Sequence, residues 1–459
     1  MEYKIEKTIN QMYKSIIYDK RTKKHRFLID IDYANEIRKK QIEYNNMLYE
    51  VPNKIYKEAM IENKNKMKKV DYCERYYNKK SVITESEIFD ISEEIKETKD
   101  ENQLFQTLNK VIDKKLISTI HSIQDIREKF KKNGENELNV LIVGGGPNGL
   151  FLGNYINQLY NNSYSNIRVN VLIIDNRIES ETIRYPFIRN RYFQIGTRYL
   201  DIVLPNLYCK KDKGSSGIFI PIKYLEMLLY LKTYEEKIPL YFTKRYEKIN
   251  EMNELIRKLD IDIVYDSSGG RMEGFQLKSD MNMLKGIDME SDEYSFKIDK
   301  KNNYVKFNLN GKIDRFLNID VYGNNEEDSS SITFEPVSFD ITNNYDFQLL
   351  RDVCIKKEDM LSIIPKIKDV RLRKMIVGLY VEGIRNNKNI KYVRMNTFNM
   401  DMYHRLKVAQ ILNTKNHRYL YIGTGDTIFS SHYIVGAGLN RTLMFSIKTC
   451  HFFPLLFVA

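Results

Sequence analysis

Three glycines in the central part of the chain have the spacing of a phosphate-binding loop. Gly144, Gly146 and Gly149 form a G-x-G-x-x-G pattern directly after the apolar run 138–143. In such a loop the first glycine permits a tight turn, the second lets a pyrophosphate approach the backbone, and the third allows the next helix to pack closely. The amides at the start of that helix carry a partial positive charge and face the phosphates. The pattern therefore predicts a dinucleotide-binding βαβ unit.

A carboxylate follows where a ribose-binding acid is expected. After a helix-like stretch to about Tyr160, a second buried strand at 169–175 ends in Asp175. A carboxylate at this strand end can accept hydrogen bonds from both hydroxyls of a ribose. Gly153 lies on the same helical face as Gly149 and extends the close packing. Strand, glycine loop, helix, strand and terminal acid together predict that the chain binds a dinucleotide.

A second glycine-containing segment lies near the end of the chain. The sequence YIGTGDTIFSSHYIVGAGLN at 421–440 places Asp426 after a predicted strand. Gly436, Gly438 and Asn440 follow, just before a predicted helix. We expect the strand that opens this segment to close the sheet begun at 138–143.

The pairing of these two segments resembles the FAD-binding domain of the group A flavoprotein monooxygenases, the flavin-dependent aromatic hydroxylases. In that family the aspartate after the distal strand holds the ribityl chain, and the later helix start contacts the isoalloxazine pyrimidine. The resemblance assigns these roles to Asp426 and to 436–440. It implies FAD as cofactor, NADPH as reductant, and oxidation of a substrate by reduced flavin and oxygen.

The middle of the chain is similar to the MICAL monooxygenase domain of the same group. Four segments follow its order and spacing: DNR at 175–177, FIRNRYFQI at 187–195, IFIPIKYLEMLLY at 218–230 and DIVYDSSGGRMEGF at 262–275. The family's arginine–asparagine pair beside the flavin falls on Arg189 and Asn190. The implied substrate is a small molecule or a protein side chain.

The candidate cofactor-binding residues come from the glycine loop, the strand ends and the distal segment. They are Gly144, Gly146, Pro147, Asn148, Gly149, Asp175, Arg177, Arg189, Asn190, Asp426, Gly436, Gly438, Leu439 and Asn440. No catalytic acid or base is assigned. Where the family has an Ala-Asp-Gly motif that touches FAD and the nicotinamide cofactor, this chain has a serine, Ser268, in place of the aspartate. The loop after Asp426 also departs from the family, so the wall of the active site differs.

Two residues near these segments have alternative interpretations. His432 is either a proton shuttle beside a flavin, because its unperturbed pKa allows both forms near neutrality, or a surface histidine. Asp266, at the end of a predicted strand, either binds a cofactor hydroxyl or caps a turn. The sequence alone leaves both alternatives open.

Composition limits the class of protein. The chain has 459 residues, of which 42% are apolar and 29% charged. This is enough for roughly two to four folded domains. The four cysteines lie far apart and the six histidines form no ligand spacing, so we expect a reducing compartment, the cytoplasm, and no bound metal. The sequence has no uncharged apolar run of spanning length, so we expect neither a signal peptide nor a transmembrane segment.

The chain carries a formal net charge of +12, which permits an anionic partner. The basic residues of 1–80 are interleaved with acids, so a nucleic-acid partner is not indicated. No glycine occurs before Gly134, and this predicts a mostly helical N-terminal region that includes an amphipathic helix at 104–120.

We predict an α/β fold, a Rossmann-like FAD-binding domain with an inserted antiparallel sheet domain and an α-helical N-terminal extension. Its parts are 1–134, the helical extension; 135–271, the first part of the FAD-binding domain; 272–395, the inserted domain; and 396–459, the second part with a buried C-terminal helix. Within them the pattern predicts helices at 191–204, 222–236, 357–388 and 399–412, strands at 238–243, 261–265 and 418–426, and antiparallel strands over 272–352.

The favoured function is an FAD-dependent monooxygenase. Two alternatives remain at this stage. One is a flavin-dependent reductase or dehydrogenase, and the other is a non-catalytic FAD-binding module whose basic helical extension binds a partner.

Overall fold

The structure is a computed structural model of the chain. It describes residues 2–19, 24–25, 36, 123–161, 166–175, 178–179, 182–183, 192–196, 203–204, 217–242, 249–269, 294–299, 304–309, 314–322, 337–388, 390–400, 402–415, 417–430 and 437–457. The chain divides into two compact units. The first comprises Met1–Asp30, Lys110–Phe307 and Met402–Ala459, and the second Ile31–Asn109 and Asn308–Asp401.

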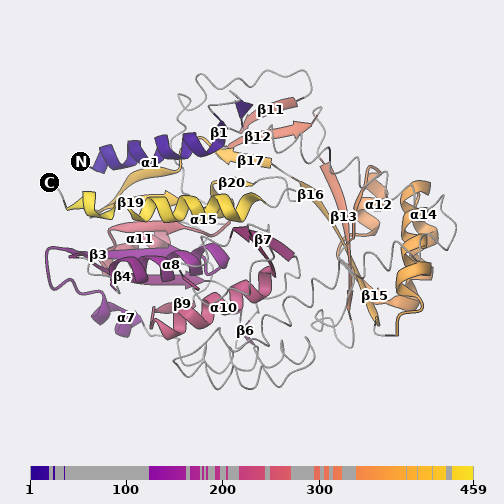
Figure 1. Cartoon of the computed structure of the whole chain (residues 1–459), viewed down its shortest axis with the longest axis horizontal. Coiled ribbons are helices and arrows are strands. Elements are labelled where there is room, and N and C mark those ends of the chain that lie inside the picture. The colour runs from indigo at the N-terminus through magenta and orange to yellow at the C-terminus, as the bar shows by residue number, and fades with distance from the viewer. Residues whose placement is uncertain are drawn as a thin grey trace. The chain divides into compact units, whose positions relative to one another are not determined.

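A six-stranded sheet organises the first unit, with strands in the order β18-β19-β10-β3-β4-β9 (Figure 1). Their bounds are Ala409–Thr414, His417–Gly423, Ile263–Asp266, Glu137–Val143, Arg168–Asp175 and Leu240–Phe242. The five strands from β19 to β9 are parallel, and β18 pairs antiparallel with β19 at the edge. The predicted strands are confirmed, and the distal strand β19 joins the sheet begun by β3.

One face of this sheet is covered by α7 (Ile123–Lys129) and α11 (Ile249–Lys258). Leu141 and Val143 of β3 point to this face and pack with Phe130, which follows α7, and Ile256 of α11. The burial of these fully apolar side chains drives the layer together.

The opposite face is covered by α8 (Pro147–Tyr160), α10 (Ile222–Glu235) and α15 (Ala437–Cys450). The helices α10 and α15 both pack against α8, which lies on β4 (Figure 1). Both faces of the parallel strands are therefore buried, as continuous apolar runs such as VLIID require. The predicted buried C-terminal helix is confirmed as α15, in which Leu443, Phe445 and Cys450 are fully buried.

The N-terminal helix α1 (Glu2–Ile17) closes the free edge of the sheet. Asn10 accepts hydrogen bonds from the amides of Val408 and Ala409 and donates to the Ala409 carbonyl. Tyr13 of α1 donates to the carbonyl of Ile428. The polar side chains of α1 thus replace a neighbouring strand along β18, which leaves that edge covered.

A smaller antiparallel sheet, β11-β12-β17-β20, also belongs largely to the first unit. Its strands are Tyr294–Asp299, Tyr304–Leu309, Met402–Arg405 and Phe429–Ser430. Three short hairpins complete the described strands of this unit: β1–β2 (Tyr18–Asp19, Lys24–His25), β5–β6 (Ile178–Glu179, Thr182–Ile183) and β7–β8 (Tyr192–Gly196, Gly217–Pro221).

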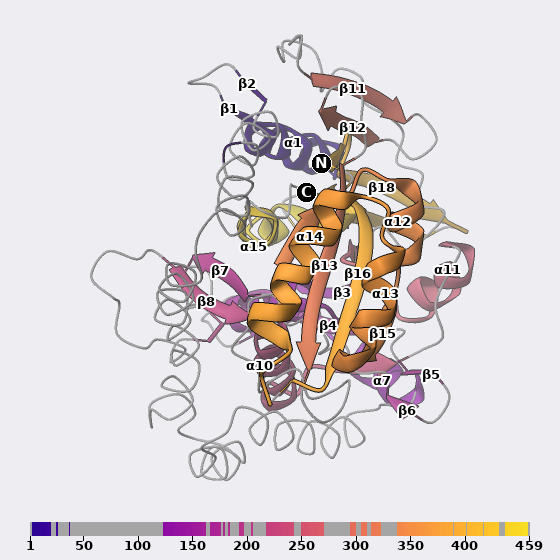
Figure 2. The same ribbon diagram turned by 90° about the vertical axis from the view of Figure 1, so that its right-hand side faces the viewer.

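The second unit contains the antiparallel sheet β14-β13-β16-β15, with bounds Val337–Asp340, Asp314–Tyr322, Tyr392–Met400 and Val353–Lys356. Three helices, α12 (Asn344–Leu349), α13 (Met360–Ile363) and α14 (Val370–Leu379), lie over one face of it (Figure 2). Their core includes Leu317 and Val393 from the strands and Leu372 and Ile376 from α14. Short turns η2 (Lys357–Asp359) and η3 (Ile364–Lys366) flank α13, and η4 (Tyr380–Ile384) extends α14. The predicted helical segment 357–388 and the antiparallel strands within 272–352 are confirmed.

Two helices predicted from the sequence are wrong. The segment 191–204 contains the strand β7, which pairs with β8, and 399–412 contains the end of β16, then β17 and the start of β18. In β17, Met402 and His404 are buried and Tyr403 between them is less so, which is the period of a strand. In so short a segment the spacing of apolar residues fits both a helix and a strand, and pairing with partner strands determines which of the two forms.

Part of the predicted N-terminal extension lies outside the described residues, including the amphipathic helix at 104–120. Among the described helices, none is both long and apolar enough to span a bilayer.

Candidate functional site at the carboxyl edge of the sheet

The glycine loop connects β3 to α8 at the carboxyl edge of the parallel strands. Gly144 has a φ of +103°, in the left-handed region, and a Cβ built there would lie 2.6 Å from the carbonyl oxygen of Ser267. A Cβ at Gly149 would overlap the carbonyl oxygen of Gly144. Both glycines are therefore required by the shape of the loop itself.

Close packing of α8 on the sheet depends on two glycines, as the sequence predicts. A Cβ at Gly149 would lie 3.3 Å from the Cγ2 of Ile142 in β3, and a Cβ at Gly153 would lie 2.7 Å from the Cδ1 of Ile173 in β4. Gly149 therefore both packs against the strand and lets the loop fold back on Gly144.

The first turn of α8 presents backbone amides without a protein cap. Its N-cap, Gly146, has no side chain, Pro147 occupies the first turn, and no acidic residue lies there. Amide groups in the first helical turn lack intrahelical partners, and the helix dipole adds positive potential at this end. This helix start can hold an anion such as a phosphate.

Three parallel strands end beside this loop. The amide of Ser267, after β10, donates to Val143 of β3, and the amide of Thr424, after β19, donates to Asp266 of β10. These bonds extend the sheet by one residue and bring the segments 144–149, 267–269 and 424–427 together. The two motifs found in the sequence thus meet at one edge, where ligands bind in open α/β sheets.

Asn148 joins the three segments. Its Nδ2 donates to Ser267 Oγ at 3.1 Å and to Thr424 Oγ1 at 2.9 Å, and its Oδ1 accepts from Ser446 Oγ of α15 at 3.0 Å. Asn148 is buried, as are Thr424 and Ser446. Its side chain therefore holds the site together, so that any contact it makes to a ligand has to come from its backbone.

Asp266 is a structural carboxylate. Its Oδ1 accepts from the amide of Ser268 at 2.9 Å and from Thr427 Oγ1 at 3.2 Å, while its Oδ2 accepts from Tyr421 Oη at 2.7 Å. The residue is fully buried. Of its two possible roles, the structure supports the turn cap, because its Oδ1 holds the amide of Ser268 and its Oδ2 is occupied by the Tyr421 hydroxyl.

Ser268 contributes an unusual hydroxyl. Its Oγ is buried and has no hydrogen-bond partner in the described part of the chain. A buried hydroxyl without a partner is destabilising, and proteins rarely retain one without a purpose. Its amide nitrogen is only 3.0 Å from a Cβ built on Gly144, so the serine adjoins the glycine loop. It is an available donor or acceptor for a ligand at this edge.

Asp175, at the end of β4, is buried and accepts a hydrogen bond from the amide of Gly145 at 2.8 Å. The predicted ribose-binding acid is thus beside the glycine loop and also fixes its conformation. The hydroxyl of Tyr230, from α10, approaches the same glycine.

Asp426 lies on the exposed side of the turn after β19. Gly425 precedes it with a φ of +64°, and Tyr403 of β17 donates to the Asp426 carbonyl at 2.6 Å. The Cβ of Asp426 is 4.0 Å from a Cβ built on Gly269. Asp426 therefore adjoins the turn that carries Ser268.

The start of α15 contains three further predicted residues, Gly438, Leu439 and Asn440, all partly exposed. Gly436, Arg177, Arg189, Asn190 and His432 lie outside the described residues. Sequence reasoning missed Thr424, Ser446, Tyr421 and Tyr403, which support the site through hydrogen bonds. Tyr421 and Thr424 lie within the segment 421–440 that the sequence singled out, while Ser446 and Tyr403 have no local signal.

A buried histidine supports the adjoining sheet. Burial lowers the pKa of His404 in β17 to about 4, and a hydrogen bond between its Nδ1 and the carbonyl of Arg405 opposes this only in part. The imidazole is therefore neutral near pH 7. Among the described residues there is no group of three or more His, Cys, Asp or Glu side chains that could hold a metal ion.

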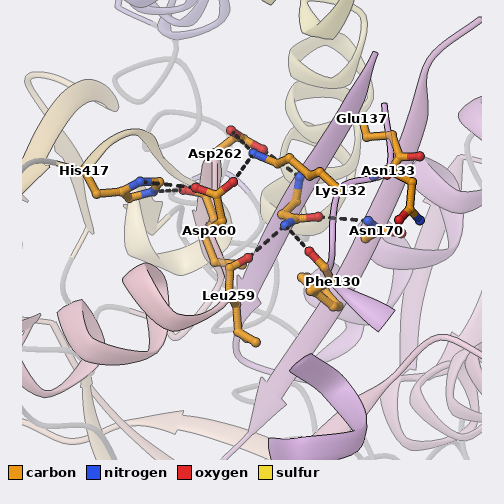
Figure 3. A network of polar contacts seen from close by, with 11 residues as sticks. Phe130, Lys132, Asn133, Glu137, Asn170, Leu259, Asp260, Asp262 and His417 are labelled. Atoms are coloured by element: carbon orange, nitrogen blue, oxygen red, sulfur yellow. Dashed lines mark hydrogen bonds and ion pairs between the residues drawn. The ribbon is translucent and has the colours of Figure 1, made fainter. Parts of the chain in front are cut away.

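A second polar network lies at the amino ends of the same strands (Figure 3). Lys132 is 2.8 Å from both Asp260 and Asp262, and Asp262 also accepts from the Asn139 amide. Burial raises the pKa of Asp262. For Lys132, burial lowers the pKa, but the hydrogen bonds that it donates to the two aspartates and their negative charges outweigh this, so that its pKa is raised. These bonds fasten the α7–β3 connection to β10, which is a structural role.

No family model matches the sequence, and no curated protein matches it. One similar solved structure is PqsL from Pseudomonas aeruginosa in complex with 2-aminobenzoylacetate, at 12% identity over 70% of this chain and 87% of that chain, with a TM-score of 0.34. Another is a flavoprotein/dehydrogenase from Cytophaga hutchinsonii, at 12% identity over 70% of this chain and 79% of that chain, with a TM-score of 0.36. A third is the p-nitrophenol 4-monooxygenase PnpA from Pseudomonas putida, at 10% identity over 70% of this chain and 81% of that chain, with a TM-score of 0.33. At these scores the similarities carry no argument about this chain.

Proposed function

We propose that the chain is an FAD-dependent monooxygenase acting on an unidentified small molecule or protein side chain. The observation that carries the proposal is the meeting of two separate glycine segments at one edge of a parallel sheet, around the Ser268 hydroxyl, which has no partner in the described part of the chain. The motif resemblance to the group A flavoprotein monooxygenases, and to the MICAL monooxygenase domain within them, supplies the identity of the cofactor.

The residues at this edge fit an FAD. The uncapped amides of the first turn of α8 would hold the pyrophosphate. Asp175, oriented by the Gly145 amide, would accept from the adenosine ribose. Ser268 would gain the partner that its hydroxyl lacks. On the family pattern Asp426 would hold the ribityl chain.

The remaining predicted residues take their roles from the family resemblance. The start of α15 would contact the pyrimidine ring, with Arg189 and Asn190 beside the flavin and Arg177 and Gly436 completing the cofactor-binding set. When bound, FAD supplies the electron transfer and the activation of oxygen, and the protein positions and shields it. NADPH is the proposed reductant.

The proposed division of the chain assigns 135–271 and 396–459 to FAD, 272–395 to the substrate, and 1–134 to a helical extension. The proposed location is the cytoplasm, because the four cysteines are widely separated and the two described ones, Cys354 and Cys450, are free thiols.

A second candidate is a flavin-dependent reductase or dehydrogenase, which is favoured by the neutral Ser268 where the family has an aspartate at the nicotinamide approach. The other alternative is a non-catalytic FAD-binding module whose basic helical extension binds a partner. Oxygen consumption driven by NADPH supports the monooxygenase, whereas bound flavin without NADPH oxidation supports the binding module.

The test is an absorbance spectrum of the purified chain, followed by denaturation and identification of any released flavin. We expect non-covalent FAD in a ratio near one per chain, either as purified or after reconstitution. Gly149→Ala is the matched variant, because its added Cβ overlaps Gly144 within the loop, and we expect it to hold no flavin. Absence of flavin from the reconstituted wild-type chain would refute the proposal.

A further inference from the structure

The segment of the second unit that contains α13 and α14 carries a large share of the protein's positive charge. Residues 356–391 contain ten Lys or Arg and four Asp or Glu, a net charge of +6, which is half of the +12 of the whole chain. A surface of this kind attracts anionic partners over about one Debye length. The proposed flavin chemistry makes no use of it.

The charge is arranged on α14 around exposed apolar side chains. Leu372 and Ile376 are buried against the sheet, and at helical spacing Val370, Lys374 and Val377 lie on the opposite side. Val370 is 53% exposed and Val377 39%, with the exposed Lys374 between them. We call this the α14 face.

Other residues of α13, η3 and α14 are also basic or aliphatic and exposed. Arg371, next to Val370, is exposed. Leu361 of α13 is 61% exposed, and Lys366 of η3, which contacts α14, is exposed as well. Figure 2 shows α13 and α14 over the same face of the sheet, with β13 and β16 visible between them. Exposed aliphatic and basic side chains therefore occur on α13, on η3 and on α14.

Two acidic residues beside the start of α14 are engaged in the fold. Asp369 caps α14 by accepting from the amides of Arg371 and Leu372. Asp346 is fully buried and accepts from the amides of Lys368 and Asp369. The exposed acids of this segment that the structure describes, Glu358 and Asp359, lie on η2 before α13. The basic side chains of α14 thus keep their attraction for an outside partner.

We propose that the α14 face binds the surface of an anionic lipid bilayer. Such a surface accepts both parts of the face, since lysine and arginine interact with the headgroups while aliphatic side chains enter the boundary of the acyl region. Nucleic acid would use the charges alone, because its phosphates make no contacts with valine or leucine. A second copy of the chain would bring two positive faces together, which repel.

The experiment is co-sedimentation of the full chain with vesicles of phosphatidylcholine alone or mixed with phosphatidylserine. We expect binding only to the mixed vesicles, and weaker binding as salt is raised. The double variant R371E/K374E should lower vesicle affinity at least about tenfold, since each basic residue near the surface contributes about fivefold. The double variant V370S/V377S should also weaken binding, and what binding remains should be more sensitive to salt.

Control variants make the same chemical changes in the first unit. Lys448→Glu reverses an exposed charge on α15, and Leu455→Ser removes a side chain that is 44% exposed; both should bind vesicles as the wild type does. Circular dichroism checks that each variant is folded. The proposal is overturned by absence of binding to the anionic vesicles, or by vesicle binding that both double variants leave unchanged. Binding to duplex DNA that displaces the vesicles and is indifferent to V370S/V377S would assign the face to nucleic acid instead.

Discussion

The Nδ2 of Asn148 and the Oγ1 of Thr424 are joined by a hydrogen bond of 2.9 Å, although 276 residues separate them in the sequence. Asn148 belongs to the first turn of α8, and Thr424 follows β19. Both are buried, and Ser446 of α15 completes the set by donating to the other side of the amide. The glycine loop and the distal turn are therefore held as one unit by contacts that do not need a ligand.

Gly149→Ala should disrupt this unit. The added Cβ would overlap the carbonyl oxygen of Gly144, which is backbone and cannot rotate away. We expect a loss of unfolding free energy of about 1–3 kcal/mol, the usual cost of overpacking. Chemical denaturation measures it. Gly134→Ala is the control, because nothing lies within 4 Å of its Cβ, and it should be neutral. Equal stability of the two variants would show that the loop has a different conformation.

Asp175→Ala should weaken FAD binding for two reasons. It removes the proposed acceptor for the ribose, and it removes the acceptor that orients the Gly145 amide. A lost hydrogen bond to a charged group costs about 1.5–3 kcal/mol, so the dissociation constant should rise at least about tenfold. Fluorescence titration of the apoprotein with FAD measures it.

A comparison of adenosine diphosphate with inorganic pyrophosphate separates the two effects of Asp175. If the carboxylate binds the ribose, the variant should also bind adenosine diphosphate less tightly than it binds inorganic pyrophosphate, relative to wild type. Unchanged FAD affinity in a folded Asp175→Ala chain would show that Asp175 only caps the loop.

The predictable part of the fold is the part with local signals. The βαβ unit was found from Gly144 to Asp175 because its turn, helix start and strand end are all encoded within a short stretch. The strands within 399–412 were missed because their pairing depends on partners far away in the sequence, such as β12 for β17. Local apolar spacing cannot report such partners.

The same distinction applies to the site. Asn148 was identified as a residue of the glycine loop, but its partners Thr424 and Ser446 come from two other elements. The role of Asp266 as a cap required the positions of Tyr421 and Thr427. The Oγ of Ser268 is buried and has no hydrogen-bond partner within the described residues. No sequence pattern encodes this lack of a partner.

Protonation of His404 should destabilise the protein in mild acid. Burial lowers its pKa from 6.5 to about 4 in the folded chain. The unfolded chain therefore binds the proton more readily between these values, so the stability is fully present above pH 6.5 and is lost as pH falls toward 4. The full contribution is about 3 kcal/mol.

Urea unfolding at a series of pH values checks this slope. His404→Gln removes the titrating ring, so its stability should fall less steeply over this range than that of the wild type. His451→Gln, at an exposed position on the turn after α15, is the control and should keep the wild-type slope. A wild-type stability that is level from pH 7 to pH 5 would contradict the prediction.

Ser268→Ala should change stability and cofactor affinity in opposite directions. The wild-type hydroxyl is buried without a partner in the described chain, so its removal should leave the apoprotein equally or more stable, by up to about 1 kcal/mol. If the hydroxyl binds FAD, the same change should weaken that binding, by about five- to tenfold for one neutral hydrogen bond. A merely structural serine would change both quantities in the same direction. Thermal unfolding of the apoprotein and FAD titration give the two values.

Ser268→Asp tests the departure from the family at the approach to the flavin. A neutral hydroxyl here alters the electrostatics where the family has a carboxylate, so we expect slow reduction of the wild-type flavin by NADPH when no substrate is bound. The aspartate variant should be reduced faster, as judged by anaerobic stopped-flow bleaching of the flavin absorbance. Asp266 lies two residues away and is fully buried, so the larger side chain at position 268 needs a control for crowding. Ser268→Asn provides it, because asparagine is similar in size to aspartate but carries no charge. Reduction of the flavin in this variant should remain slow. Rapid reduction of the wild type that neither variant alters would mean that the nicotinamide reaches the flavin by a route that does not pass Ser268.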